Sequence, residues 1–123
     1  MTREEMKART KSYAKRIVKV CEALPDQWVP RTLGKQLLRS GTSVGANYRA
    51  VCRAKSTADF LNKLRIVEEE CDESLFWMEL LVECALVKGA RLSGLMQEAN
   101  ELLAITVAAA RTTRASKPSP ARS

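Results

Sequence analysis

Residues 56–86, STADFLNKLRIVEEECDESLFWMELLVECAL, decide the fold. Apolar residues in this segment recur every three or four positions, which places their side chains on one face of an α-helix. The residues of this stripe are Phe60, Leu64, Val67, Cys71, Leu75, Met78, Val82 and Ala85. Ser56 and Asp59 have the spacing of a capping box, in which two side chains bond the free amide groups at a helix start. The segment therefore predicts a long helix over residues 57–87, ended by Gly89.

The same apolar spacing occurs in three further segments. It predicts helices over residues 4–24 and 30–54, and a fourth that Ser93 caps and that extends to about residue 113. Thr2 and Glu5 have the capping-box spacing before the first of these helices. Pro30 is expected at or near the first helical position of the second helix, which leaves Trp28 in the preceding connection. Four helices joined by short connections predict an all-α fold, an antiparallel up-down-up-down four-helix bundle.

Three glycines, Gly34, Gly41 and Gly45, lie inside the second predicted helix. Each costs about 1 kcal/mol relative to alanine in a helix interior. We interpret them as positions where another helix packs closely, with a kink or the approach of a ligand as the alternatives.

The chain of 123 residues is long enough for one domain. We assign residues 1–113 to the bundle. Residues 114–123 contain two prolines, no large apolar residue and several basic residues. This composition predicts a disordered basic tail.

Several classes of function are excluded by what the sequence lacks. It contains no histidine, which rules out Ser-His-Asp triads, Cys-His pairs and histidine metal sites, and it has neither of the glycine-rich phosphate-binding motifs. The four cysteines form no C-x-x-C pair, which is typical of a reduced cytoplasmic protein. The longest nearly apolar run, Leu102–Ala110, is about half of the roughly 20 residues that a membrane span requires. We therefore expect a cytoplasmic protein with no catalytic site, cofactor, bound metal or membrane contact.

Charge is distributed unevenly along the chain. The net charge is +7, but residues 1–55 carry +9 and residues 56–86 carry −6. Basic side chains on the first two helices could contact nucleic-acid phosphates without reading bases, although a basic stripe is often only a solvated face. The candidates for phosphate contact are Lys15, Lys19, Lys35, Arg39, Arg49 and Arg53. The candidates for subunit contacts or core packing are the aromatic residues Trp28, Tyr48, Phe60 and Trp77. The alternative for Trp28, Phe76 and Trp77 is that they stack on nucleic-acid bases.

Two segments carry a resemblance to a known family. Residues 36–50 contain the pattern Gln-Leu, Ser-x-x-x-Asn, Tyr-Arg-Ala, and residues 70–77 read Glu-x-Asp-Glu-x-x-x-Trp. The fourth predicted helix matches at Leu95, Glu98, Ala99, Leu102, Leu103 and Ile105. These patterns resemble the bacterial four-helix-bundle family of 23S rRNA-intervening sequence proteins. The resemblance implies an up-and-down bundle that forms a ring-shaped homo-oligomer, typically a pentamer. Related accessory proteins of diversity-generating retroelements bind a reverse transcriptase and nucleic acid through basic surface.

These observations lead to one functional expectation and one alternative. We expect a non-enzymatic homo-oligomeric scaffold whose basic surface binds the backbone of RNA or DNA, because several copies of a weak basic stripe raise avidity. The alternative is a protein–protein interaction module, in which Trp28, Trp77 and the acidic face bind a basic protein partner.

Overall fold

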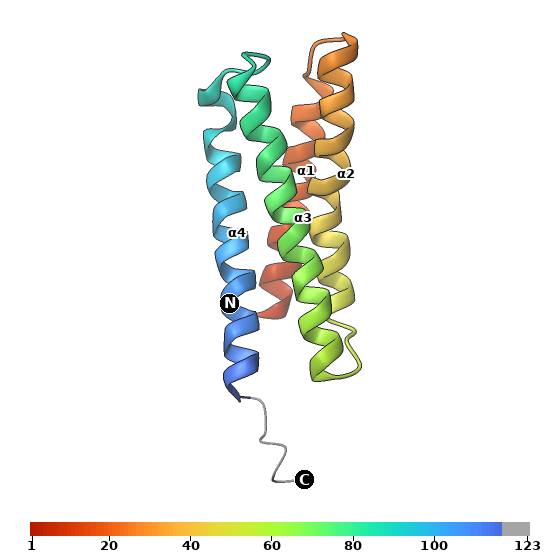
Figure 1. Ribbon diagram of the computed structural model, residues 1–123, viewed down its shortest axis with the longest axis vertical. Coiled ribbons are helices and arrows are strands. Elements are labelled where there is room, and N and C mark those ends of the chain that lie inside the picture. Colours follow the sequence, from red (N-terminus) through yellow and green to blue (C-terminus); the bar gives the residue numbers. More distant parts are fainter. Residues whose placement is uncertain (117–123) are drawn as a thin grey trace.

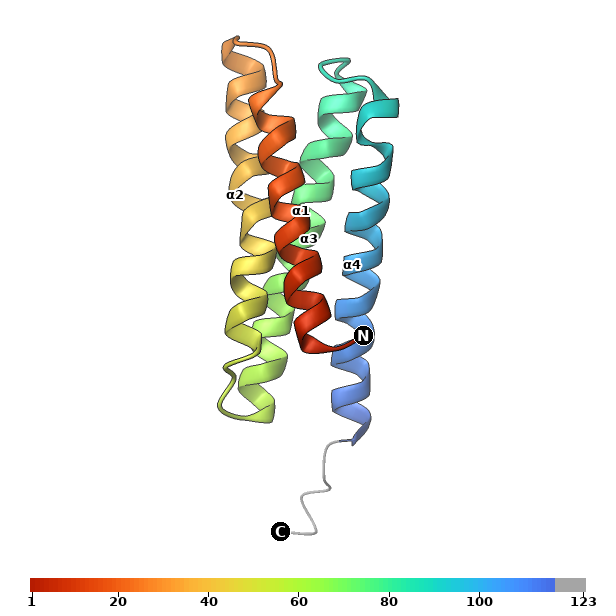
Figure 2. The ribbon, with the colours of Figure 1, turned by 180° about the vertical axis from the view of Figure 1, so that it is seen from behind.

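The computed structural model describes residues 1–116, which form four α-helices. The helices are α1 (Arg3–Glu22), α2 (Trp28–Val51), α3 (Thr57–Glu83) and α4 (Gly89–Ser116). They run alternately up and down side by side, with α3 in front of α1 in Figure 1 and behind it in Figure 2. The predicted all-α four-helix bundle is confirmed.

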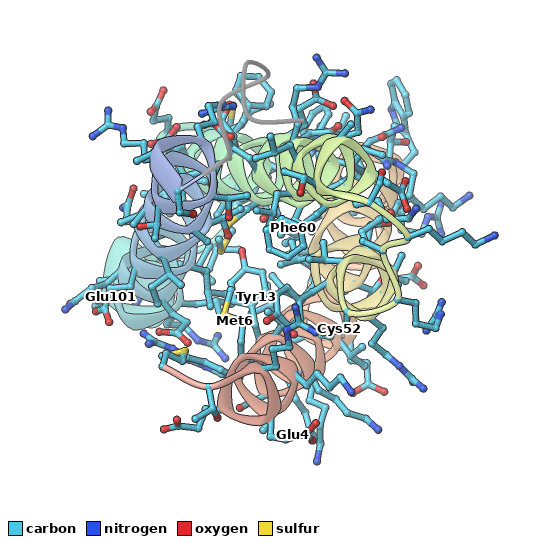
Figure 3. The ribbon with its side chains drawn as sticks, turned by 90° about the horizontal axis from the view of Figure 1, so that it is seen from below. Glu4, Met6, Tyr13, Cys52, Phe60 and Glu101 are labelled. Atoms are coloured by element: carbon cyan, nitrogen blue, oxygen red, sulfur yellow. The ribbon has the colours of Figure 1, made fainter. Side chains whose placement is uncertain are left out.

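Each helix packs along its length against its neighbours in sequence, whereas α1 and α4 approach each other only lightly. Helices α1 and α3 have no close backbone contact and occupy opposite corners of the bundle. Figure 3, seen along the bundle, shows the four corners with Phe60, Tyr13 and Met6 pointing toward the middle. Basic α2 therefore lies beside acidic α3, and basic α1 does not.

Two of the helices begin at side-chain caps that the sequence predicts. At α1, the Glu5 backbone N–H donates to Thr2 Oγ1 at 3.0 Å and the Thr2 N–H donates to Glu5 Oε1 at 2.9 Å. At α3, the Asp59 N–H donates to Ser56 Oγ at 3.0 Å, but the Asp59 carboxylate accepts from the Lys55 N–H instead of closing a capping box. The starts of both helices lie within one residue of the prediction.

The predicted start of α2 is wrong by two residues. The helix begins at Trp28, so Pro30 lies at its third position and Trp28 belongs to the helix instead of the connection. The first four amide groups of a helix have no acceptor within it, so a proline anywhere in the first turn loses no helical hydrogen bond. The predicted end at residue 54 is also too late, because α2 ends at Val51.

The predicted junction between α3 and α4 is wrong as well. Helix α3 ends at Glu83, and Ala85 adopts a left-handed φ of 58°. The Leu86 N–H then donates to the Leu81 carbonyl at 2.9 Å, which is the hydrogen bond of a Schellman motif. Gly89 is the first residue of α4 rather than the end of α3, and Ser93 lies inside α4.

The far end of α4 extends beyond the predicted limit of the bundle. The helix continues to Ser116, so residues 114–116 are helical. The remainder of the predicted disordered tail, residues 117–123, lies outside the described residues.

Glycines let α1 and α2 pack closely. A Cβ atom on Gly41 would lie 2.7 Å from Cγ1 of Ile17, and one on Gly34 would lie 2.7 Å from Cδ1 of Leu24. Real Cβ atoms do not approach other atoms so closely, so the interpretation of these glycines as packing positions is confirmed.

The core contains a few polar groups, and all have partners. The hydroxyls of Tyr13 on α1 and Ser74 on α3 lie 2.7 Å apart across the middle of the bundle. The thiol of Cys71 donates to the Ala99 carbonyl of α4 at 3.2 Å, and burial raises the pKa of Cys71 to about 12. Every buried side-chain nitrogen or oxygen within residues 1–116 makes a hydrogen bond. These bonds connect opposite and adjacent helices at fixed heights.

Candidate nucleic-acid interface

Helix α1 turns its lysines toward solvent. Met6, Thr10, Tyr13 and Ile17 are buried on one side of the helix. A four-residue step advances only about 40° around a helix, so Lys11, Lys15 and Lys19 follow one another along the opposite side. All three side chains are exposed, and none forms an ion pair within residues 1–116.

Helix α2 presents a second basic row. Its buried side includes Leu37, Gly41, Val44 and Tyr48. The residues that recur on its outer side at steps of three, four or seven form what we name the α2 stripe. They are Trp28, Arg31, Lys35, Thr42, Ala46, Arg49 and, in the turn after the helix, Arg53.

Six exposed cations of these two rows make no ion pair in the part of the chain that the structure describes. We call them the α1/α2 face. They are Lys11, Lys15, Lys19, Lys35, Arg49 and Arg53. Helices α1 and α2 pack against each other, which brings five of the six predicted phosphate contacts onto neighbouring helices. Lys11 joins this set through its place on the exposed side of α1, although it was not among the six residues selected from the sequence.

Arg39, the sixth predicted phosphate contact, has a different role. Its guanidinium reaches across to α3, where it donates to Glu70 at 3.0 Å and also to Glu73. The Nε1–H of Trp77 donates to the same Glu73 carboxylate at 3.0 Å. Trp77 and Arg39 both lower the pKa of Glu73, and the carboxylates raise the pKa of Arg39. The charge of Arg39 is therefore balanced within the chain.

The acids of α3 do not reach the basic row of α1. Helices α1 and α3 are diagonal, and Arg9, the cation of α1 that pairs with another helix within residues 1–116, contacts α4 at Glu98 (2.7 Å) and Glu101 (2.6 Å). Figure 3 shows Glu101 on the outer side of α4. Several α3 acids remain exposed without an ion pair within residues 1–116: Glu69, Asp72, Glu79 and Glu83. Charge is thus separated between the outer sides of the bundle.

The four aromatic candidates occupy different environments. Tyr48 is buried in the core, and Phe60 is half-buried at the lower end of the bundle, where Figure 3 shows it pointing to the axis. Trp77 is half-buried on the outer side of α3, whereas Trp28 is 72% exposed. Among the described residues, Trp28 forms no aromatic pair with Tyr48, Phe60 or Trp77.

Two exposed apolar residues of α3 lie outside the four aromatic candidates for subunit contacts. Phe76 is 51% exposed and packs edge-on against Trp77, with ring centroids 5.0 Å apart. Ile66 is 42% exposed and lies eleven residues before Trp77, which is three helical turns and hence the same side of α3. We call Ile66, Phe76 and Trp77 the α3 patch. Neither Ile66 nor Phe76 belongs to the periodic apolar stripe. An apolar residue outside such a stripe is expected on the exposed side of the helix, and this is the sequence signal for both.

A small pocket lies at the lower end of the bundle. The pocket that all four helices line, at the lower end of the bundle, has a volume of about 190 Å³ and is bounded mainly by apolar side chains such as Met6, Phe60, Leu64 and Ile105. Within residues 1–116, no three histidine, cysteine or acidic side chains are placed to hold one metal ion. None of the helices α1 to α4 is both long enough and apolar enough to cross a membrane.

Comparison with known proteins places the chain in a family. Residues 4–108 match the model of the 23S rRNA-intervening sequence proteins. A crystal structure from Bacteroides thetaiotaomicron, of a protein with unknown function from the S23 ribosomal protein family, is 32% identical and superposes with a TM-score of 0.80. The match covers 85% of this chain and 97% of that one. No functionally curated protein matches the sequence. With four helices, the shared fold and a family match over nearly the whole described region, the chain belongs to the 23S rRNA-intervening sequence protein family.

Proposed function

We propose that the protein is a non-enzymatic, homo-oligomeric cytoplasmic scaffold that binds the backbone of RNA or DNA through the α1/α2 face. One observation carries this proposal: six exposed cations on two neighbouring helices lack acidic partners, although the same chain has acids to spare on α3. Arg39 and Arg9, by contrast, have acidic partners on neighbouring helices, so the six cations are the ones left to attract an anionic ligand.

The chemistry of the face favours phosphates over bases. Each Lys or Arg that neutralises a phosphate releases condensed counterions, so binding weakens steeply as salt rises. The six cations are spread along two helices instead of being gathered in a pocket, and such a row follows a backbone without reading sequence. We therefore expect salt-sensitive binding of low sequence specificity.

Self-association would use a different side of the molecule. In the α3 patch the aromatic residues Phe76 and Trp77 lie one helical turn from Glu73, the partner of Arg39, and aromatic residues and arginine are enriched at protein interfaces. We propose that this patch forms subunit contacts in a ring, a pentamer as the family resemblance implies. Several copies would then present several α1/α2 faces to one nucleic acid, which raises the overall affinity without new contacts.

Light scattering on nuclease-treated protein tests both the self-association and the nucleic-acid binding. The mass should be several times the 13.7 kDa of one chain, and Phe76→Asp should reduce it to that of a monomer, because a carboxylate would be desolvated in the contact. Added RNA should shift the mass at about 50 mM salt and not at about 200 mM. A monomer that ignores RNA at both salt concentrations would refute the proposal.

The exposed acids of α3 support a second candidate function. Glu69, Asp72, Glu79 and Glu83 have no ion pair within residues 1–116, and a basic protein partner would complement them. A reverse transcriptase is one such partner, given the resemblance to retroelement accessory proteins. Capture of one discrete basic protein by the wild type, unchanged after RNA removal and lost in Glu69→Lys/Asp72→Lys, would favour this alternative over the nucleic-acid scaffold.

A further inference from the structure

We infer that Trp28 and Lys35 form a stacking site for an unpaired base, which makes single-stranded nucleic acid the preferred ligand of the α1/α2 face. The inference rests on the proposed function, since it specifies which form of nucleic acid the basic face holds. It concerns the upper end of the α2 stripe, where the stripe begins with an aromatic residue.

Trp28 contributes little to the fold. At 72% exposure, it shows more of its surface than any other large apolar side chain among the described residues. Its indole N–H makes no hydrogen bond within residues 1–116, whereas Trp77 donates to Glu73 and packs against Phe76. An aromatic ring left in water in this way has its face free for a ligand.

The position of Trp28 connects it to the basic face. Lys35 lies seven residues further along α2, which is two helical turns on the same side and about 10 Å along the axis. Lys35 has no ion pair in the described chain, while Arg31 between them pairs with Asp26 at 2.7 Å. From Lys35 the stripe continues to Arg49 and Arg53, so a phosphate backbone following the cations would bring a base to the ring.

Stacking distinguishes single strands from duplexes. Every base has a π-face that can stack on an indole, whereas in a duplex these faces are already stacked on neighbouring bases. Arginine and lysine side chains contact the phosphates of either form. Trp28 should therefore add affinity for a single strand and almost none for a duplex, which makes it the residue that sets the preference.

The test compares a single RNA strand of about 16 nucleotides with the same strand in a duplex, by fluorescence anisotropy on the full chain. Trp28→Ala should weaken binding of the single strand by about tenfold or more and change duplex binding less than about twofold, and Trp28→Phe should restore most of the loss. Val29→Ala is the matched control, because it trims an exposed apolar side chain in the same turn of α2 without removing an aromatic ring. Circular dichroism confirms that each variant is folded.

A second readout reports on the ring itself. The chain has two tryptophans, so in a Trp77→Phe background the fluorescence comes from Trp28 alone. Stacking should quench this fluorescence when the single strand is added and leave it unchanged with the duplex.

The outcomes separate this inference from the proposed function. If both forms bind and Trp28→Ala weakens neither or weakens both equally, the stacking site is refuted and the basic scaffold stands. If Trp28→Ala instead lowers the oligomer mass, the ring belongs to a subunit contact and the inference is again refuted. If neither form binds the wild type, the proposed function fails and this inference fails with it.

Discussion

The guanidinium of Arg39 on α2 lies 3.0 Å from the carboxylate of Glu70 on α3, at the boundary between the basic and the acidic parts of the bundle. A second contact to Glu73 makes Arg39 a bridge between two α3 side chains. The cations of the α2 stripe before and after Arg39 in sequence, Lys35 and Arg49, have no such partner in the described chain. Basic residues that the sequence alone does not distinguish therefore differ in whether their charge is free to bind a phosphate.

This difference predicts opposite effects for two substitutions. Arg39→Gln should lower the free energy of unfolding slightly, because it removes a solvent-exposed ion-pair network, and should leave RNA affinity nearly unchanged. Arg49→Gln should weaken RNA binding and leave stability nearly unchanged. Urea unfolding and anisotropy measure the two quantities. Equal losses of RNA affinity in both variants would show that the Arg39 ion pairs do not withhold it from phosphate.

Close packing of α1 on α2 predicts that Gly41→Ala destabilises the fold. The new Cβ would lie 2.7 Å and 2.8 Å from two carbons of Ile17, which is itself fully buried. Overpacking costs more than the helix propensity gained, so we expect a loss of about 1–2 kcal/mol in urea unfolding. Gly94→Ala is the control: its Cβ meets only the flexible Arg16 side chain at 3.5 Å, and it should stabilise the protein by up to about 1 kcal/mol. A stabilised Gly41→Ala would mean that the helices can separate without cost.

The left-handed residue after α3 predicts a stabilising substitution. Ala85 has a φ of 58°, where its Cβ costs roughly 1 kcal/mol, and glycine has no such cost. Ala85→Gly should therefore raise the midpoint of thermal unfolding. Ala90→Gly, within the first turn of α4, should lower it. If the two substitutions shift the midpoint alike, the turn does not hold Ala85 in this conformation.

The buried thiol of Cys71 predicts a loss of stability at alkaline pH. Burial raises the pKa of Cys71 to about 12, above the value of about 8.5 for an exposed thiol. The unfolded chain therefore releases this proton first, and the free energy of unfolding falls as pH rises from about 9 toward 12. Cys71→Ser keeps a donor for the Ala99 carbonyl and does not titrate in this range, so its stability should fall less steeply. Cys84→Ser, at an exposed position, should follow the wild type. Parallel curves for wild type and Cys71→Ser would contradict the burial of this thiol.

The sequence predicts the fold well because its strongest signals are local. The apolar period of residues 56–86 and the caps at Thr2 and Ser56 depend only on neighbours along the chain. The ends of helices were predicted less well: the termination of α3 at Ala85 uses an alanine where the sequence rules expect glycine. The start of α2 was misplaced because a proline can occupy any position in the first turn of a helix, not only the first.

The candidate site could be predicted only in part. The cations of α1 and α2 follow from composition and spacing, but which of them keep a free charge depends on the opposite helix. Arg39 lies beside Glu70 because α2 and α3 are adjacent, and Lys15 forms no ion pair with the acids of α3 because α1 and α3 are diagonal. The exposure of Trp28 also follows from the three-dimensional position of the first turn of α2. These relationships become visible only once the helices are packed.

The central claim, that the α1/α2 face binds nucleic-acid backbone, is tested most directly by the salt dependence of RNA affinity in two triple variants. Lys35→Gln/Arg49→Gln/Arg53→Gln removes three cations from the face, and Arg65→Gln/Lys88→Gln/Arg91→Gln removes three exposed, unpaired cations elsewhere in the described chain. The slope of the logarithm of affinity against the logarithm of salt should become shallower by about 0.7 for each lost phosphate contact, so by about 2 in the first variant, and should stay unchanged in the second. Equal slopes and equal affinities in the two variants would contradict the claim, since net charge alone would then account for the binding.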